Sequence, residues 1–256
     1  RLSSTMQFDR SRFMDREVLD PGRVMEGAQG GMGQSRGAIQ TDLDNSLDFL
    51  KNPVDLGTSI MAVAFDGGVI VGADSRTSTG VYIANRVSDK VTAIDDKIYV
   101  CRSGSAADTQ AISDIVTAQL QQHRTQYGKP PKVITAASYF REMCYHNKNG
   151  LTAGIIVAGW DAAKGGQVYS VPVGGALLER PYTIGGSGST YIYGFCDAYY
   201  KPGMTREQCE EFTAKALSHA MARDGSSGGV IRMVIIDANG TERKFIPGNK
   251  LPFGPL

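Results

Sequence analysis

The sequence predicts an α+β fold in which two antiparallel sheets are stacked and helices cover both outer faces, a four-layer αββα sandwich. Short apolar runs follow one another across hairpin turns, and two intervening segments carry apolar residues at helical spacing instead. The elements run in the order strands, two helices, strands, helices, strands. The strands are too short and too often joined by hairpins for a doubly wound parallel sheet, which is therefore not expected.

The first strands are expected at residues 58–65 (TSIMAVAF) and 68–75 (GVIVGADS). The turn Asp66-Gly67-Gly68 separates them, and Asp-Gly between apolar stretches is a strong hairpin signal. A further strand is expected at residues 98–103 (IYVCRS).

Two helices follow, and each shows a one-sided apolar stripe. The first opens with a capping-box-like start from Ser105 to Asp108, and the linker after it ends in Lys129-Pro130-Pro131. The two stripes consist of Ile112, Ile115, Val116 and Leu120 in the first helix and of Val133, Ala136, Ala137, Phe140, Met143 and Cys144 in the second. Stripes of this kind face the core, so we assign no chemistry to them.

The rest of the chain returns to strands, with one more helix before the last hairpin. Strands are expected at residues 152–160, 167–173 and 181–186. A capping box at Thr205-Arg-Glu-Gln208 begins a helix. Its inner face is expected to consist of Cys209, Phe212, Thr213, Ala216 and Ala220. The strands 229–237 and 241–246 close the fold as a hairpin around Asn239-Gly240.

Composition indicates an ordinary globular protein. The chain has 256 residues, of which 41% are hydrophobic and 21% charged, and its net charge is +1. This balance gives no reason to expect a nucleic-acid or membrane partner, and no apolar run approaches the roughly 20 residues that span a bilayer. The first 17 residues lack the apolar stretch of a signal peptide, so secretion is not expected.

Cysteine and histidine spacing argues against a metal centre. The four cysteines form no CxxC pair, and the three histidines lie far apart in the sequence. We therefore expect neither a metal nor a cofactor, and we expect reduced thiols in a cytosolic or nuclear setting. These residues are Cys101, Cys144, Cys196 and Cys209, with His123, His146 and His219.

Residues 1–57 differ in composition from residues 58–256. The stretch 28–46 is rich in Gly, Gln, Ser and charged residues and has few large apolar ones. Such a segment buries too little surface to offset its ordering entropy, so we expect it to be flexible or held by partners. It is either a disordered tail or a removable pro-segment.

A set of short polar motifs decides between these alternatives. Gly57-Thr58 opens the first strand, and it is followed in order by GADSR (72–76), NRVSDK (85–90), SGSAAD (103–108), GGSGST (185–190) and RDGSSGG (223–229). Over about residues 57–246 this set resembles the proteasome β subunits, within the N-terminal nucleophile hydrolases. The resemblance is strongest to the β1 type, which is associated with cleavage after acidic residues. It implies a propeptide at 1–57, cleavage between Gly57 and Thr58, and a catalytic domain at 58–256.

The proposed nucleophile is Thr58. A threonine hydroxyl is a poor nucleophile at neutral pH and needs an adjacent base. Cleavage after Gly57 creates a free α-amine on Thr58 itself, and the reference pKa of such an amine is roughly 7.7 to 8.0. The amine is therefore substantially neutral at physiological pH and can act as the general base, directly or through a water.

The resemblance implies roles for six further residues. Lys90 lies near the Thr58 hydroxyl and Asp74 fixes the lysine, although an Asp–Lys pair can also be a surface ion pair worth about 0 to 1 kcal/mol. A second group holds and polarises the new amine, and the Gly104 N–H supplies the oxyanion hole. This second group consists of Ser187, Asp224 and Ser227, which in Gly-rich turns can also serve turn formation alone.

Substrate selection is implied for residues around Arg102. A guanidinium at the base of the pocket pairs with an acidic substrate side chain, the alternative being an exposed arginine at a strand end. Thr77, Ser88, Thr92 and Ala106 are expected to form other pocket walls, and Ser78 and Ala106 to bind the peptide backbone in β-strand fashion. Residue 59 is Ser where the family usually has a second Thr, and we expect only a small effect.

The resemblance thus predicts a threonine endopeptidase subunit of the 20S core that hydrolyses unfolded, ubiquitin-targeted proteins. The expected partners are other β subunits in a heptameric ring, an α ring, the opposite β ring and regulatory caps, in cytoplasm and nucleus. A β subunit that fills the ring without cutting is the first alternative, and the intact set Thr58, Asp74, Lys90 and Ser187 argues against it. The second is the bacterial relative that forms hexameric rings, against which Arg102 and the long pro-segment argue.

Overall fold

The computed structural model describes residues 57–79 and 82–253, so the expected propeptide at 1–57 lies outside these residues except for Gly57. The predicted N-terminal hairpin is confirmed. Strand β1 (Ile60–Phe65) pairs antiparallel with β2 (Gly68–Ala73), with Ile60 opposite Ala73. Strands β10 (Tyr182–Gly185), β11 (Ile231–Asp237) and β12 (Gly240–Ile246) complete this sheet in the order β10-β1-β2-β11-β12.

A second antiparallel sheet has the order β5-β6-β7-β8-β9. Its strands are β5 (Val91–Asp95), β6 (Ile98–Gly104), β7 (Ala153–Asp161), β8 (Gly165–Val171) and β9 (Leu178–Glu179). The strands β3 (Thr77–Thr79) and β4 (Tyr82–Asn85) form a separate two-stranded ribbon. The sequence pattern did not predict β3, β4, β5 or β9, because these strands are short or carry polar and exposed residues.

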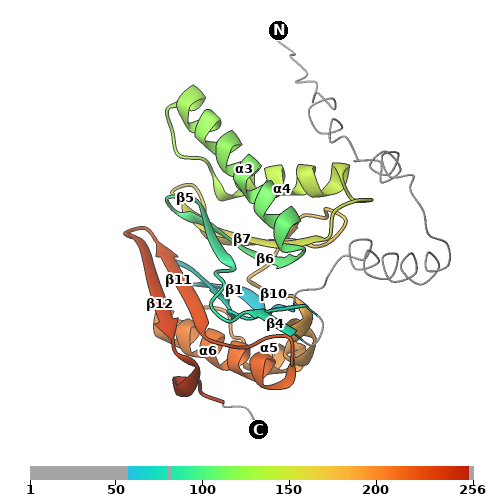
Figure 1. Ribbon diagram of the computed structural model, residues 1–256. Coiled ribbons are helices and arrows are strands. Elements are labelled where there is room, and N and C mark those ends of the chain that lie inside the picture. Colours follow the sequence, from blue (N-terminus) through green and yellow to red (C-terminus); the bar gives the residue numbers. More distant parts are fainter. Residues whose placement is uncertain (1–56, 80–81, 254–256) are drawn as a thin grey trace, which may run out of the picture. The chain divides into compact units, whose positions relative to one another are not determined.

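Helices cover the outer face of each sheet (Figure 1). The helices α3 (Ala106–Tyr127) and α4 (Val133–His146) pack on the second sheet. The helices α5 (Tyr193–Tyr199) and α6 (Arg206–Arg223) pack on the first sheet. Two 3-10 turns, η2 (Ser187–Tyr191) and η3 (Gly248–Lys250), complete the described elements. The predicted α+β, four-layer αββα sandwich is confirmed.

Burial of both faces explains why the strands β1 and β2 read as nearly continuous apolar runs. In β1, Ile60 and Ala62 belong to the core between the two sheets, whereas Met61 and Val63 belong to the core beneath α6. Successive residues of a strand point to opposite faces, and here both faces are buried. The result is a pair of stacked sheets whose edges and ends, rather than their faces, are available for chemistry.

The predicted helix signals are largely confirmed. Thr205 and Gln208 form the complete capping box of α6. In α3 the Ser105 hydroxyl accepts from the Asp108 N–H, but the Asp108 carboxylate accepts from the Thr152 N–H at 3.4 Å instead of returning to the cap. The predicted stripes are buried throughout except for Ile115, which is partly buried. Among the described helices, none combines the length and apolarity that a membrane span requires.

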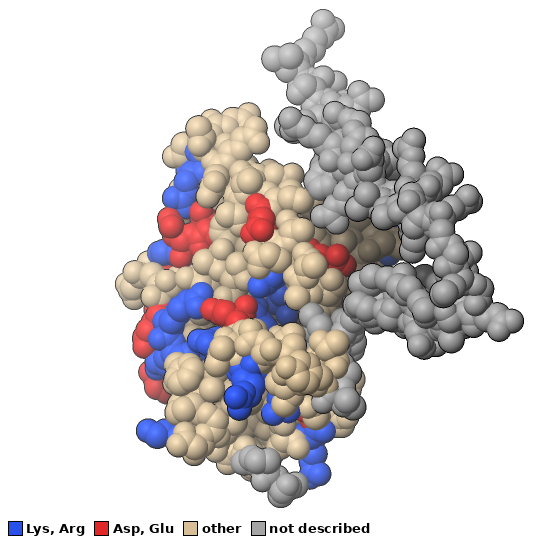
Figure 2. All heavy atoms as spheres, viewed as in Figure 1, with Lys and Arg blue, Asp and Glu red and all other residues tan. Residues whose placement is uncertain are grey.

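Charged side chains hold the outer layer of the first sheet together. On the face shown in Figure 2, basic and acidic side chains are interspersed among larger areas of other residues. Arg206 of α6 pairs with Glu210 at 3.0 Å and with Glu242 of β12, and Lys244 of β12 pairs with Glu210 at 2.6 Å. These ion pairs connect α6 to β12, the strand at the edge of the first sheet.

Candidate active site

Thr58 lies where the chain enters the first strand of the sandwich, and it is only 5% exposed. Asp74 follows β2 directly, so the β1–β2 pairing brings it beside the residues that precede β1. The Asp74 N–H donates to the Ser59 carbonyl at 3.0 Å, and the Ser59 N–H donates to Asp74 Oδ1 at 2.9 Å. Residues that are distant in sequence are thus held together by ordinary sheet geometry.

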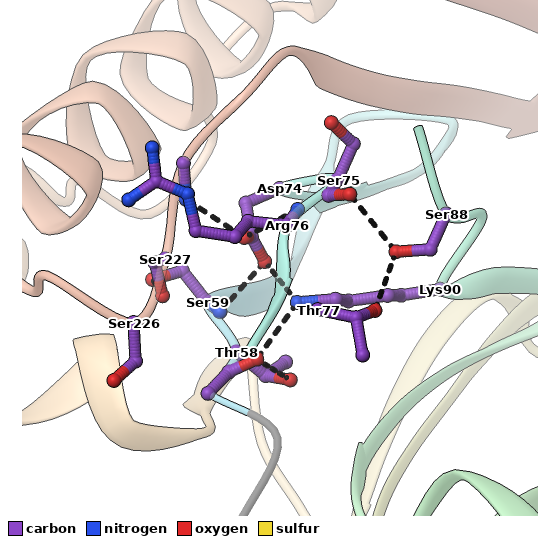
Figure 3. A network of polar contacts seen from close by, with 12 residues as sticks. Thr58, Ser59, Asp74, Ser75, Arg76, Thr77, Ser88, Lys90, Ser226 and Ser227 are labelled. Atoms are coloured by element: carbon purple, nitrogen blue, oxygen red, sulfur yellow. Dashed lines mark hydrogen bonds and ion pairs between the residues drawn. The ribbon is translucent and has the colours of Figure 1, made fainter. Parts of the chain in front are cut away.

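Lys90 and Asp74 form a buried ion pair (Figure 3). Lys90 Nζ lies 2.7 Å from Asp74 Oδ1, and the two side chains are 9% and 0% exposed. The Asp74 carboxylate also accepts from the Arg76 N–H at 3.1 Å and the Gly228 N–H at 3.0 Å, both through Oδ2. A buried charge needs such partners to offset its desolvation, so the pair is not the exposed surface ion pair considered above.

Burial changes the acidity of Lys90. The loss of hydration lowers the pKa of the ammonium below its usual value of 10.5, while the neighbouring Asp74 carboxylate opposes this shift. The ammonium therefore gives up a proton more easily than an exposed lysine does. A lysine with this property suits proton transfer as well as charge stabilisation.

The carbonyl oxygen of Gly57 receives two donors. The Thr58 hydroxyl donates to it at 2.5 Å, and Lys90 Nζ donates to it at 3.0 Å. Gly57 has φ of +60°, and a Cβ built there lies 2.2 Å from the Ser226 Cβ, so any other residue at position 57 is strained and crowded. The glycine thus allows the chain to turn with its carbonyl group beside the Thr58 hydroxyl and Lys90.

A second carboxylate organises the other side of Thr58. Asp224 caps the C-terminus of α6, and its Oδ2 accepts from the hydroxyls of Ser187 at 2.7 Å and Ser227 at 2.6 Å. The Thr58 N–H donates to the Ser187 hydroxyl oxygen at 3.0 Å. The nitrogen that cleavage after Gly57 would free is therefore in contact with this second group.

Three of the residues expected to form the substrate pocket also make hydrogen bonds. The Thr77 hydroxyl donates to Ser88 Oγ at 3.0 Å, and Ser88 Oγ donates to the Ser75 carbonyl at 2.9 Å. Ser78 lies in β3 and its hydroxyl donates to the Ser226 carbonyl at 3.3 Å. Thr77 and Ser88 are thus connected to Ser75, the residue after Asp74, and Ser78 is connected to Ser226.

Arg102 and Gly104 lie on β6, beside Lys90. The Arg102 N–H donates to the Lys90 carbonyl at 3.1 Å, which ties the two backbones together. The Arg102 side chain is half-buried, desolvation lowers the pKa of its guanidinium, and its Nε has no hydrogen-bond partner within the described part of the chain. Gly104 ends β6 with φ of +97°, Thr92 lies on β5, and Ala106 is the first, exposed residue of α3.

The described residues contain no group of three or more His, Cys, Asp or Glu side chains arranged to hold a metal ion. The four cysteines are free and buried. Burial raises the pKa of the Cys101 thiol to about 12, so this thiol is a poor nucleophile.

Comparison with known proteins identifies the family. A family model described as "Proteasome subunit" matches residues 54–236. The chain belongs to the proteasome subunit family. It is 63% identical over 205 residues to "Proteasome subunit beta type-6" of Dictyostelium discoideum, covering 80% of this chain and 96% of the relative. It is 57% identical over 205 residues to "Proteasome subunit beta type-1" of Saccharomyces cerevisiae, covering 80% and 94%.

A third relative extends the comparison. "Proteasome subunit beta type-9" of Rattus norvegicus is 50% identical over 214 residues, covering 84% of this chain and 97% of the relative. The chain is thus a β-type proteasome subunit of the 20S core, as the motif set indicated. It belongs to a family of peptidases and assembles with other proteasome subunits.

Three residues take part in the polar networks of this proteasome subunit although the sequence did not single them out. Arg76 and Gly228 act through backbone N–H groups on Asp74, which no side-chain pattern reveals. Ser59 was noted only for a missing methyl group, yet its hydroxyl donates to Ser227 Oγ at 2.8 Å. The available signal was its position next to the proposed nucleophile.

Proposed function

We propose that this proteasome β-type subunit is a catalytic subunit of the β1 type, a threonine peptidase that is activated by cleavage between Gly57 and Thr58 and cuts preferentially after acidic residues. One observation carries the proposal. The Thr58 hydroxyl and the Lys90 ammonium meet at the Gly57 carbonyl oxygen, at 2.5 and 3.0 Å. A hydroxyl and a cation at the carbonyl of the bond to be cut are what intramolecular acyl transfer requires.

Self-cleavage then proceeds in two steps. The Thr58 oxygen attacks the Gly57 carbonyl carbon, the hydroxyl proton passes to the Thr58 nitrogen, and the amide bond is replaced by an ester. Water then hydrolyses the ester, which leaves a carboxylate on Gly57 and a free hydroxyl and amine on Thr58. Lys90 stabilises the negative charge that develops on the carbonyl oxygen, because its Nζ already donates to that atom.

Turnover of a peptide uses the same groups. The freed amine of Thr58, with a reference pKa of roughly 7.7 to 8.0, takes the hydroxyl proton as the oxygen attacks the substrate carbonyl. The proton passes to the departing amine, and water hydrolyses the acyl-enzyme. Ser187, Asp224 and Ser227 hold the amine, the buried Asp74–Lys90 pair supplies the positive charge, and the N–H of Gly104 is the proposed oxyanion donor.

Acidic preference rests on Arg102. Its guanidinium remains a cation in a protein despite the lowered pKa, and its Nε is without a partner among the described residues. A substrate carboxylate would pair with this guanidinium through a charge-assisted bond. Thr77, Ser88, Thr92 and Ala106 complete the proposed pocket, and Ser78 and Ala106 bind the substrate backbone.

The same proposal covers the rest of the molecule. Residues 1–57 are the propeptide and residues 58–256 the catalytic domain. The partners are the other β subunits of a heptameric ring, the α ring, the opposite β ring and regulatory caps. Unfolded, ubiquitin-targeted polypeptides are the substrates, and the particle works in cytoplasm and nucleus.

The variant Thr58→Ala tests this function. We expect no cleavage after Gly57 and no turnover of acidic peptides, with assembly unchanged, because the hydroxyl performs both attacks. The chain is purified from particles whose other active subunits are silenced, and its mass and N-terminal sequence are determined. Thr58→Ser, which keeps the hydroxyl, is the control and should start at residue 58. Maturation of the alanine variant would rule out Thr58 as the self-cleaving nucleophile.

A further inference from the structure

Ser59 lies between Asp74, the first carboxylate of the site, and Ser227, which binds the second carboxylate, and it contacts both of these residues (Figure 3). Its backbone is bound to Asp74 in both directions, at 2.9 and 3.0 Å. Its hydroxyl donates in the opposite direction, to Ser227 Oγ at 2.8 Å. The residue is only 1% exposed, so water does not compete for this hydroxyl.

The hydroxyl begins a chain of hydrogen bonds that ends at the Thr58 nitrogen. Ser227 Oγ donates a hydrogen bond to Asp224 Oδ2 at 2.6 Å, and this carboxylate oxygen also accepts from Ser187 Oγ at 2.7 Å. Ser187 Oγ in turn accepts from the Thr58 N–H at 3.0 Å. A hydroxyl that accepts a hydrogen bond is a stronger donor, so Ser59 strengthens the bond by which Ser227 holds Asp224.

The space around the hydroxyl is shaped for it. A Cβ built at Gly188 would lie 1.8 Å from Ser59 Oγ and 3.2 Å from Ser227 Oγ. Any side chain at position 188 would therefore displace the Ser59 hydroxyl. Gly188, the glycine of the SGS motif, thus leaves room for the Ser59 hydroxyl.

We propose that Ser59 is a positioning residue of the peptidase, whose hydroxyl acts through Ser227 and Asp224 on Ser187 and so on the amine of Thr58. The inference rests on the proposed function, because it concerns the base of that reaction. Ser59 touches none of the groups at the Gly57 carbonyl oxygen, which are Thr58 Oγ1 and Lys90 Nζ. Its loss should therefore slow turnover while self-cleavage still reaches completion.

The pH dependence follows from the charge on Asp224. Hydrogen bonds to this carboxylate reduce the negative potential at the amine. When the Ser227 bond weakens, the carboxylate favours the ammonium form of Thr58 more strongly, and the amine pKa rises. Activity that depends on the neutral amine is then lost at a higher pH, so the acid limb moves upward by about 0.3 to 0.7 pH units for a two- to fivefold change in the equilibrium.

The matched pair Ser59→Thr and Ser59→Val tests the proposal, since the two side chains have the same branched shape and differ in the hydroxyl. Each full-length chain is assembled into particles whose other active subunits are silenced, and kcat, KM and the pH profile are measured on an acidic peptide. We expect Ser59→Thr to keep turnover within about twofold of the unsubstituted chain. We expect Ser59→Val to lower kcat about 3- to 10-fold, the size of one lost hydrogen bond, with KM unchanged and the acid limb shifted upward.

A double-mutant cycle provides the second measurement and avoids an added methyl group. Ser59→Ala should lower kcat in the unsubstituted chain but not in a Ser227→Ala background, because the path to the amine is already broken there. Equal kcat for the threonine and valine variants, or additive losses in the cycle, would overturn the positioning role. If Ser59→Ala fails to assemble, Ser59 is needed for folding, and the positioning role is overturned as well. If instead the unsubstituted chain keeps the Gly57–Thr58 bond, the proposed function itself fails, and this inference fails with it.

Discussion

The buried cluster around Thr58 and the candidate substrate pocket around Arg102 are built differently. Thr58, Asp74 and Lys90 are 5%, 0% and 8% exposed, and each side chain is hydrogen-bonded. Arg102 is half-buried with an unmet Nε donor among the described residues, and Ala106 is exposed. The side chains of the cluster are thus paired with one another, whereas Arg102 keeps one buried nitrogen without a partner among the described residues.

The difference corresponds to two proposed functions, catalysis by the cluster and substrate selection by the pocket. Groups that act on every peptide bond must stay in place from one turnover to the next, and buried hydrogen bonds hold them. A group that selects a substrate must exchange water for a substrate atom, so it needs an open donor. Substitutions in the cluster should therefore affect all substrates equally, and substitutions in the pocket should affect one class.

After Thr58→Ala, the largest effect is expected for Lys90→Ala. We expect kcat to fall by roughly 10²- to 10⁴-fold on every peptide, because the acid–base or electrostatic assistance at the reacting oxygen is lost. Because Lys90 also assists the proposed self-cleavage, steady-state rates on acidic, basic and apolar peptides are divided by the fraction of chains that begin at Thr58. Lys164→Ala removes an exposed lysine that pairs with Glu179 and serves as the control. Near-normal turnover in the Lys90 variant would show that the Lys90–Asp74 ion pair has a structural role only.

Charge reversal at Arg102 should separate the pocket from the cluster. A charge-assisted bond is worth roughly 1.5 to 3 kcal/mol, which corresponds to about 10- to 150-fold in specificity. Arg102→Glu should lose cleavage after Glu or Asp and gain it after Lys or Arg, with little change after small apolar residues. Matched fluorogenic peptides give kcat/KM for each class. A uniform decrease in kcat/KM for all peptide classes would show that Arg102 supports the cluster. Unchanged values would contradict the proposed acidic preference.

The pH profile tests the cluster without a substitution. Burial lowers the pKa of Lys90 below 10.5, so the ammonium is lost at a lower pH than that of an exposed lysine. If turnover requires the cation, kcat/KM should fall about tenfold per pH unit on an alkaline limb that begins below pH 10.5. Return to neutral pH should restore the rate, which excludes denaturation. A flat profile on this side would argue against a role for the Lys90 charge.

The smallest effect is expected at the pocket wall. Thr77→Val keeps the side-chain shape and removes the hydroxyl that donates to Ser88. Loss of one neutral hydrogen bond, at about 0.5 to 1.5 kcal/mol, should raise KM about 2- to 10-fold with kcat nearly unchanged. Thr77→Ser, which keeps the donor, is the control. A fall in kcat as large as that of Lys90→Ala would place Thr77 in the cluster.

Local pattern predicted the elements whose residues are buried on a periodic face. The hairpin of β1 and β2, the stripes of α3 and α4 and the capping box of α6 all follow from short-range spacing. The strands β3 and β4 were not predicted, because they form by pairing with each other and do not show apolar periodicity. The candidate nucleophile and its partners were named from motifs, since each motif carries its reactive residue within a few positions.

The residues alone thus specify which groups are present, namely a threonine after a glycine, an aspartate after the second strand and a lysine in the motif NRVSDK. Their meeting depends on long-range pairing, because the Asp74–Lys90 bond joins positions 16 residues apart and the Thr58–Ser187 bond joins positions 129 apart. The link from Ser59 to Ser227 spans 168 positions, and no local pattern encodes it. Only burial in the folded sandwich turns these common polar residues into two connected networks, because exclusion of water leaves other protein groups as their hydrogen-bond partners.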